Sequence, residues 1–299
     1  MLGELAALGT AISWTVSAVL YRRALADTKP LQANIVRLSC TSLLLVAFVV
    51  VIGKSTVFTS LPLYAVALSS LSGLIGLGLG DTLYMVSLKQ IGVSRAVPIS
   101  CTYPLFSLLF ALLIQPKTVG LGVTIAAIAI VFGIWLLAKE EEPDKGLEQK
   151  GLRIRGALFA LGAAIVWAVS ITMINAAVTL PATSNLDSAL VLNTIRVVSV
   201  AVFLLASTPL TDRKFTFTKV QRKSLILLVL GGLVALGLGW FLLAYSFLFI
   251  SEAQAVPISS TTPLFAVVLG MIFLRERITI RNVAGTLAIV FGIFILFTL

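Results

Sequence analysis

The chain alternates between long apolar runs and short polar segments. The apolar runs are about 20 residues long, the length that an α-helix needs to cross about 30 Å of hydrocarbon, and the polar segments carry nearly all of the charge. The strands of a membrane β-barrel would be shorter and would alternate in polarity. We therefore predict an all-α integral membrane protein with ten transmembrane helices, at roughly 3–21, 32–52, 62–88, 94–114, 119–138, 154–177, 188–208, 222–249, 253–274 and 279–298.

The second half of this pattern repeats the first. Residues 96–106 read AVPISCTYPLF, and residues 255–265, which lie 159 positions later, read AVPISSTTPLF. Between residues 92–137 and 251–296, 16 of 46 positions are identical without a gap. The chain is therefore a duplication, with a predicted first five-helix repeat over 1–138, a linker over 139–152 and a second five-helix repeat over 153–299.

Five helices per repeat is an odd number, so the second repeat enters the membrane from the side opposite to the first. When the loops are assigned to alternating faces, 18 Lys and Arg residues near helix ends fall on one face and only Lys54 and Lys117 on the other. Such an excess marks cytoplasmic loops. We therefore predict two inverted repeats in the cell (plasma) membrane, with the basic loops and the linker in the cytoplasm and both termini outside it.

Composition narrows the function classes. The chain is 59% hydrophobic and 11% charged, which excludes a soluble protein of this length. Its net charge of +10 lies in short loops, so topology explains it better than nucleic-acid binding does. There is no histidine, and Cys40 and Cys101 fall inside apolar runs. We expect no metal, no cofactor and no enzymatic activity; the expected partners are lipid and a small-molecule substrate, and a monomer and a homodimer both remain open.

Two prolines, six residues apart, interrupt the fourth apolar run of each repeat. An interior proline removes a backbone hydrogen bond, and a carbonyl freed within a membrane needs a partner or a wet cavity. We expect the prolines to act as hinges, with the hydroxyls of Ser100 and Ser259 beside a polar path. The alternative is that they only bend the two helices so that these pack as a crossed pair. The four residues are Pro98, Pro104, Pro257 and Pro263.

Three charged side chains fall inside predicted helices, where each costs about 2.5–3.5 kcal/mol to insert. Arg37 and Asp81 both lie roughly 8–11 Å from the cytoplasmic face, which permits an ion pair. Asp81 is the predicted coupling site for a proton or another cation; a purely structural pair with Arg37 is the alternative. Arg196 is the repeat equivalent of Arg37, but Trp240 stands at the position equivalent to Asp81. Arg196 is therefore predicted to hold a carboxylate or another anion, unless both arginines snorkel or bond to carbonyls.

Aromatic side chains recur in the same helices as these charges. Aromatic walls with a few hydroxyl groups suit amphipathic or cationic organic substrates, whereas packing or interfacial anchoring is the alternative for any single one. The predicted substrate cavity comprises Trp14, Arg37, Tyr84, Ser100, Tyr103, Trp167, Asn175, Arg196, Trp240, Tyr245 and Ser259.

Several of these motifs occur twice and in register. They are Asn34-Ile-Val-Arg37 and Asn193-Thr-Ile-Arg196, Ser13-Trp14 and Val166-Trp167, the proline-rich fourth helices, and Gly133 and Gly292. Together they resemble the EamA-like ten-helix branch of the drug/metabolite transporter superfamily. The Leu274-Arg275-Glu276-Arg277 turn matches that family's Gly-Glu-Arg turn in part, whereas the first repeat has Gln115-Pro116-Lys117 there.

The resemblance implies export or exchange of small metabolites, often amino acids or drug-like compounds. Inverted repeats recur in secondary transporters, which bind substrate near the midplane and alternate its access. We therefore expect a secondary active transporter, most simply an exporter. Two alternatives stay open, namely an antiporter of phosphorylated or nucleotide-sugar metabolites and a facilitative channel.

Overall fold

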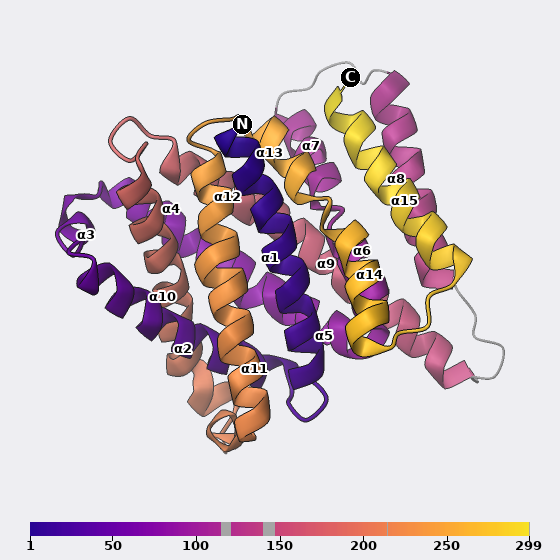
Figure 1. Ribbon diagram of the computed structural model, residues 1–299, viewed down its shortest axis with the longest axis horizontal. Helices are drawn as coiled ribbons and strands as arrows, with labels where there is room; N and C mark the ends of the chain where they lie inside the picture. The colour runs from indigo at the N-terminus through magenta and orange to yellow at the C-terminus, as the bar shows by residue number, and fades with distance from the viewer. Residues whose placement is uncertain (115–120, 140–146, 214, 299) are drawn as a thin grey trace.

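The computed structural model describes residues 1–114, 121–139, 147–213 and 215–298, and no strand occurs among them (Figure 1). Up to residue 139 the elements are α1 (Leu2–Ala24), α2 (Pro30–Val51), α3 (Val57–Ser60), α4 (Leu63–Gly73), the π-helical segment η1 (Leu74–Gly80), α5 (Asp81–Ile91), α6 (Val93–Ser100), α7 (Tyr103–Ile114) and α8 (Leu121–Lys139). From residue 147 they are α9 (Leu147–Val178), α10 (Leu186–Thr211), the 3₁₀ turn η2 (Thr216–Lys219), α11 (Arg222–Gly232), the π-helical segment η3 (Leu233–Gly239), α12 (Trp240–Ser246), α13 (Glu252–Ser259), α14 (Thr262–Leu274) and α15 (Ile280–Thr298). The turn Gln115-Pro116-Lys117 and residues 140–146 of the predicted linker lie outside the described residues.

The helices are those of a multi-pass membrane protein. The helices α8 and α15, of 19 residues each, are also apolar, over Thr124–Leu137 and Ile280–Ile295. Large apolar side chains such as Leu43 (73% exposed) and Phe291 (62%) lie on the outer surface, as expected where the solvent is lipid. Within the described ranges, seven helical stretches are long and apolar enough to cross a membrane: Leu2–Ala24, Pro30–Val51, Leu63–Ile91, Gly151–Val178, Leu186–Thr211, Arg222–Ser246 and Gln254–Leu274.

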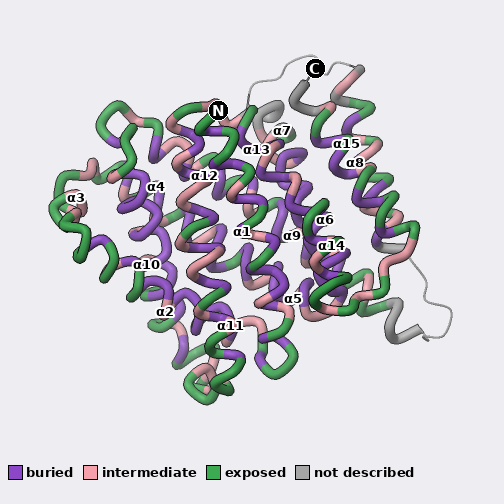
Figure 2. Tube along the Cα trace, viewed as in Figure 1, coloured by how far each residue is buried: buried purple, intermediate pink, exposed green. Residues whose placement is uncertain are grey.

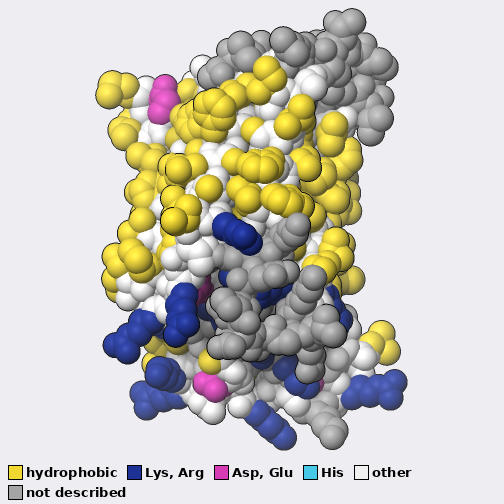
Figure 3. Space-filling view, turned by 90° about the vertical axis from the view of Figure 1, so that its right-hand side faces the viewer, with side chains coloured by type: hydrophobic (Ala, Val, Ile, Leu, Met, Phe, Trp, Pro, Cys, Tyr) yellow, Lys and Arg dark blue, Asp and Glu magenta, His cyan; other side chains and the backbone are white. Residues whose placement is uncertain are grey.

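The two ends of the molecule differ in charge. On the face shown in Figure 3, the Lys and Arg side chains gather mainly toward the lower end, below a broad band of apolar side chains. The chain begins, with α1, at the opposite end, and α15 finishes there as well (Figure 1). A difference of this kind between the two ends is what the positive-inside rule describes.

The two proline-containing apolar runs are broken rather than continuous. The predicted helix 94–114 divides into α6 and α7 at Cys101 and Thr102, and the predicted helix 253–274 divides into α13 and α14 at Ser260 and Thr261. The second proline of each pair stands in the first turn of the new helix, where its missing N–H removes no hydrogen bond. The carbonyl of Ser259, at the end of α13, accepts a hydrogen bond from Thr262 Oγ1 at 2.6 Å.

The third and eighth predicted spans each contain one π-helical segment. The segments η1 and η3 begin and end 159 residues apart, which is the spacing of the duplication. Both are rich in glycine, and glycine also stands at the preceding helix ends, where other helices come close. A Cβ at Gly73 would lie 2.4 Å from the carbonyl oxygen of Arg196, and one at Gly232 would lie 2.3 Å from Thr41 Oγ1. Other helices therefore approach the backbone closely at these glycines.

The two halves of the chain interlock. The first long helix, α1, packs mainly on α11, η3, α12, α13 and α14 of the second half. Its counterpart α9 packs mainly on α4, η1, α5, α6 and α7 of the first half. The halves also meet through α2, which contacts both α10 and α11, and through α10, which contacts α4. Buried backbone consequently runs through the middle of the bundle, along the faces where the halves meet (Figure 2).

The helices α8 and α15, which carry the repeated sequence Ala-Ile-Val-Phe-Gly-Ile, form a pair at one side of the bundle (Figure 1). Their backbones approach closely at glycine. A Cβ at Gly133 would lie 2.6 Å from the carbonyl oxygen of Gly285, and one at Gly292 would lie 2.8 Å from that of Ala126. Any larger side chain at these positions forces the pair apart.

Candidate functional site

A narrow cavity of about 40 Å³ lies at the centre, where the two halves interlock. At 10–15 Å³ for each water, it has room for about three water molecules. Both halves contribute to its wall, and among the described residues that wall carries one arginine, one aspartate and six aromatic side chains. The lining residues are Trp14, Ser17, Tyr21, Arg37, Asp81, Tyr84, Val97, Ser100, Cys101, Tyr103, Trp167, Ile171, Ala235, Trp240 and Thr262.

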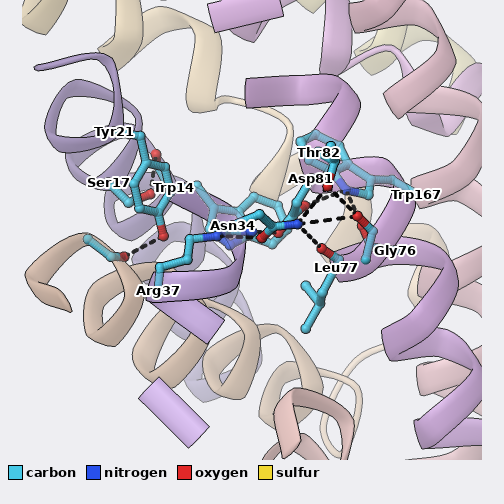
Figure 4. Close-up of polar contacts among 12 residues, drawn as sticks. Trp14, Ser17, Tyr21, Asn34, Arg37, Gly76, Leu77, Asp81, Thr82 and Trp167 are labelled. Atoms are coloured by element: carbon cyan, nitrogen blue, oxygen red, sulfur yellow. Dashed lines mark hydrogen bonds and ion pairs between the residues drawn. The ribbon is translucent and has the colours of Figure 1, made fainter. Parts of the chain in front are cut away.

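The predicted ion pair between Arg37 and Asp81 is present in this wall (Figure 4). Its side chains are only 2% and 6% exposed. The Asp81 carboxylate also accepts a hydrogen bond from Trp167 Nε1 at 2.8 Å. Arg37 donates from Nε to Asn34 Oδ1 at 2.9 Å, and its guanidinium lies 4.8 Å from the centre of the Tyr21 ring. Both carboxylate oxygens of Asp81 and two guanidinium nitrogens of Arg37 thus have a partner, as burial requires.

The π-helical segment η1 places Asp81 in this position. The backbone carbonyl groups of η1 depart from the regular α-helical hydrogen-bond pattern and are available to side chains of other helices. Asn34 Nδ2 donates to the carbonyls of Leu77 (2.9 Å) and Gly78 (3.2 Å), and Trp167 Nε1 donates to that of Gly76 (3.2 Å). Because Asp81 follows η1 directly, these bonds orient it.

The second half copies this framework without the acid. Asn193 Nδ2 donates to the carbonyl of Leu236 in η3 at 2.8 Å, as Asn34 does to Leu77 in η1. Arg196 is fully buried; its Nη2 donates to Ser170 Oγ at 2.7 Å, and its guanidinium lies 3.7 Å from the centre of the Trp240 ring. Among the described residues, its Nε and Nη1 have no hydrogen-bond partner. Arg196 therefore contacts Trp240, the residue at the position equivalent to Asp81, although Arg196 does not line the cavity.

Aromatic rings from both halves meet across the cavity. The rings of Trp14 and Trp240 have centroids 4.9 Å apart, and those of Tyr84 and Trp167 are 5.0 Å apart. Each pair joins the first long helix of one half to the third span of the other, so the rings close the site from two sides. Tyr103, which also lines the wall, shares a hydrogen bond of 2.9 Å with Ser259 Oγ.

Besides Arg196, three predicted cavity residues lie away from this wall. Asn175 donates from Nδ2 to Glu252 Oε2 at 2.7 Å, and Ser259 reaches the cavity only through Tyr103. Tyr245 packs against two phenylalanines, with ring centroids 5.9 Å from Phe241 and 4.9 Å from Phe249. The structure thus separates these side chains from the Arg37–Asp81 pair.

Other lining residues were absent from the sequence-based set. Ser17 and Tyr21 follow Trp14 by three and seven residues, the spacing that places side chains on one face of a helix. That regularity is a signal that the sequence does contain. Cys101 and Thr262 lie at the helix breaks, whose position depends on backbone contacts and has no comparable pattern.

Comparison with known proteins agrees with this architecture. Residues 1–139 and 154–298 match the EamA-like transporter family. The chain belongs to the EamA-like transporter family. It is therefore a transporter, in accord with the resemblance to the drug/metabolite transporter superfamily.

Individual relatives support the same assignment. An uncharacterized transporter of Archaeoglobus fulgidus is 29% identical over 296 residues, covering 99% of this chain and 98% of the relative. A protein of known crystal structure superposes with a TM-score of 0.66 over 98% of this chain and 95% of its own, at 14% identity. The second likeness concerns the fold alone.

Proposed function

We propose that this EamA-like protein is a secondary active transporter that exports small metabolites across the plasma membrane, with amino acids or drug-like organic amines as the substrate class. Two inverted five-helix repeats alternate the access to one central site. The interlocked halves, the π-helical segments 159 residues apart and the cavity between them support this arrangement.

One observation carries the proposal: a buried ion pair faces an aromatic cavity. Because Arg37 and Asp81 both line the cavity, a zwitterion can exchange its carboxylate and ammonium for their mutual contact without burying net charge. The rings of Trp14, Tyr84 and Trp240 then enclose an apolar or cationic substituent. Protonation of Asp81 breaks the pair and couples the cycle to a proton.

The cavity volume indicates a closed conformation. Small-molecule sites enclose about 300–1,000 Å³, whereas this cavity measures about 40 Å³. Substrate therefore enters only after helices separate. The breaks between α6 and α7 and between α13 and α14 are the natural hinges, because Ser100, Cys101 and Thr262 beside them line the cavity. In this scheme Pro98, Pro104, Pro257 and Pro263 keep the half-helices distinct.

Charge supports an orientation for the cycle. The basic end faces the cytoplasm and the end that holds both chain termini faces outward. Phosphorylated or nucleotide-sugar substrates fit the site less well, because one arginine, Arg37, lines the cavity and Asp81 neutralises it.

Counterflow in proteoliposomes tests the proposal. Vesicles preloaded with unlabelled amino acid or organic amine should take up the labelled compound faster than empty vesicles. Asp81→Asn should abolish this acceleration, whereas Asp187→Asn, which removes a half-exposed acid paired with Lys54, should leave it unchanged. Equal uptake with and without preloading would indicate a channel. Counterflow restricted to sugar phosphates would instead indicate the antiporter.

A further inference from the structure

Among the described residues, three charged side chains are buried, and one of them has no counter-charge. Arg37 and Asp81 neutralise each other, whereas Arg196, which is fully buried, makes no ion pair within the described ranges. An arginine stays charged when it is buried, and an isolated charge inside a membrane is costly. Glu148 is remote, because the hydrogen-bond partner of Arg196, Ser170, lies about 33 Å further along α9.

The first half of the chain shows how a buried carboxylate is held in this fold. One oxygen of Asp81 pairs with Arg37 Nη2, and the other accepts a hydrogen bond from Trp167 Nε1 at 2.8 Å. Arg37 is fixed in turn by the bond from its Nε to Asn34 Oδ1 at 2.9 Å. The carboxylate therefore lies between a guanidinium and an indole N–H, with one oxygen for each donor.

The second half presents the same indole donor without an acceptor. A Cβ at Gly239 would lie 2.9 Å from Trp14 Nε1, just as one at Gly80 would lie 2.9 Å from Trp167 Nε1. The two indole N–H groups thus have equivalent positions beside the residues that follow these glycines. Trp167 Nε1 has two hydrogen-bond partners, whereas Trp14 Nε1 is buried and has none among the described residues.

The arginine and asparagine of the second half are also left incomplete. Among the described residues, Arg196 Nε and Nη1 have no hydrogen-bond partner, and neither has Asn193 Oδ1. In the first half the corresponding atoms of Arg37 and Asn34 bond to each other. Buried polar atoms are nearly always paired. Unpaired atoms that gather in one frame therefore indicate a group that this frame is built to receive.

The ring of Trp240 stands where the first half has its acid. Its centre lies 3.7 Å from the guanidinium of Arg196 and 4.9 Å from the ring centre of Trp14. An indole offers no acceptor atom to these donors. Because Trp240 lines the central cavity and Arg196 does not, the ring covers the guanidinium on that side.

We propose that Arg196 and Trp14 form a carboxylate-binding subsite, which Trp240 covers in this conformation. When the ring turns aside, a carboxylate takes the place that Asp81 has in the first half, with one oxygen on Arg196 and the other on Trp14 Nε1. Arg196 Nε then donates to Asn193 Oδ1. A carboxylate fits better than a spherical anion, because its two oxygens match the two donors.

This assignment rests on the proposed function for the source of the carboxylate, which is the transported substrate. Arg37 belongs to the first half and Arg196 to the second, so a carboxylate that leaves one arginine meets the other as access alternates. Once it has moved, Arg37 and Asp81 pair again, and neither arginine is left without an anion.

Propionate is a suitable probe, because it carries a carboxylate and no ammonium. In phosphatidylcholine nanodiscs at constant ionic strength, its affinity follows from the rise of the unfolding midpoint with its concentration. The midpoint should rise with propionate but not with propylamine or chloride. An equal rise with chloride would indicate a site for inorganic anions and would overturn the substrate subsite. No rise with propionate would overturn the subsite as well.

Two arginine variants locate the binding. Arg196→Gln should weaken propionate binding at least tenfold. Arg222→Gln is the matched control, because it removes an exposed arginine at the start of α11 and should leave the affinity unchanged. Unchanged affinity in Arg196→Gln, or an equal loss in both variants, would overturn the subsite.

A pair of variants at Trp240 supplies the missing acid. The side chain introduced by Trp240→Asp should pair with Arg196 and abolish propionate binding. Trp240→Asn has the same shape without the charge and should still bind propionate. The unfolding midpoint of Trp240→Asp should exceed that of Trp240→Asn by about 4 °C or more. Equal midpoints would show that Arg196 does not lack an acid, and the proposal would fail.

Transport distinguishes this proposal from the one for the central site. If amino acid counterflow occurs in the wild type and continues at the same rate in Arg196→Gln, the subsite is refuted while the central site stands. If the wild type shows no counterflow but binds propionate through Arg196, the carboxylate subsite stands and the proposed transport is refuted.

Discussion

Replacing Asp81 by Asn tests the central ion pair directly. The substitution keeps the size and shape of the side chain and removes its charge. Arg37 then remains buried, at 2% exposure, with no acid opposite it. The amide oxygen of the new side chain still accepts the hydrogen bond that Trp167 Nε1 donates at 2.8 Å, so the variant isolates the loss of the charge pair.

The expected loss of stability is about 3 kcal/mol. Removing one partner of a buried ion pair costs about 3–5 kcal/mol, and the retained bond to Trp167 places this variant at the lower end. The surface pair between Lys54 and Asp187 provides a scale, because its side chains are 41% and 38% exposed. Breaking that pair with Asp187→Asn should cost about 1 kcal/mol or less.

A double-mutant cycle in phospholipid nanodiscs measures the pair. At about 2 °C per kcal/mol for a chain of this size, Asp81→Asn should lower the unfolding midpoint by about 6 °C. Arg37→Met alone should also destabilise, since it leaves Asp81 without its cation. The double variant should be about 2 kcal/mol more stable than the sum of the single effects, because both charges are then gone.

Two results would refute this reasoning. Additive single effects would mean that Arg37 and Asp81 do not stabilise each other. A loss of less than 1 kcal/mol in Asp81→Asn would mean that Arg37 reaches water or lipid headgroups. Transport separates structure from coupling: if the double variant regains stability and keeps the wild-type pH dependence of counterflow, Asp81 has no coupling role.

The remaining predictions concern the two helix starts that precede the prolines. Gly92 has φ +78°, and a Cβ there would lie 2.7 Å from Glu276 Oε1. Gly92→Ala should therefore lower the free energy of unfolding by about 1–3 kcal/mol. The unfolding midpoint measures this loss, and an unchanged midpoint would contradict the prediction. Burial raises the pKa of Glu252, against the hydrogen bonds from Thr172 and Asn175 that lower it. In the unfolded chain Glu252 has the ordinary pKa of about 4.3, and in the folded protein its pKa is higher. The folded state therefore holds the proton more tightly, and this contribution to the free energy of unfolding is lost as pH rises through the raised pKa. The unfolding midpoint of the wild type, measured relative to Glu252→Gln, should therefore fall from pH 4 to pH 8; a flat difference would show that Glu252 is well solvated.

Much of the candidate site was predictable because depth in a membrane follows from counting residues. Arg37 and Asp81 lie at similar distances from the basic helix ends, and an isolated charge in lipid is costly, so their pairing follows from position alone. The repeat shift of 159 likewise identifies Trp240 as the residue opposite Arg196. Both contacts are present in the structure.

Contacts between distant segments were not predictable in the same way. The separation of Asn175 from the cavity depends on Glu252, which the sequence places at the edge of a helix rather than beside α9. The cap that Glu276 provides to α6 joins residues 182 positions apart. No periodic pattern reports such a pairing, because each side chain satisfies whichever backbone group the packing brings near.

The sequence by itself determined that this chain is a duplicated, helical membrane protein, since apolar length, repeat spacing and loop charge are local properties. The tertiary structure decided how the halves interlock, with α1 and α9 each packed against the opposite half. It also decided where η1 and η3 depart from α-helical geometry, since their carbonyls are bonded by Asn34, Trp167 and Asn193 from other helices. A local sequence sets which segments are apolar and helical, but the partner of each buried polar group depends on which helices meet.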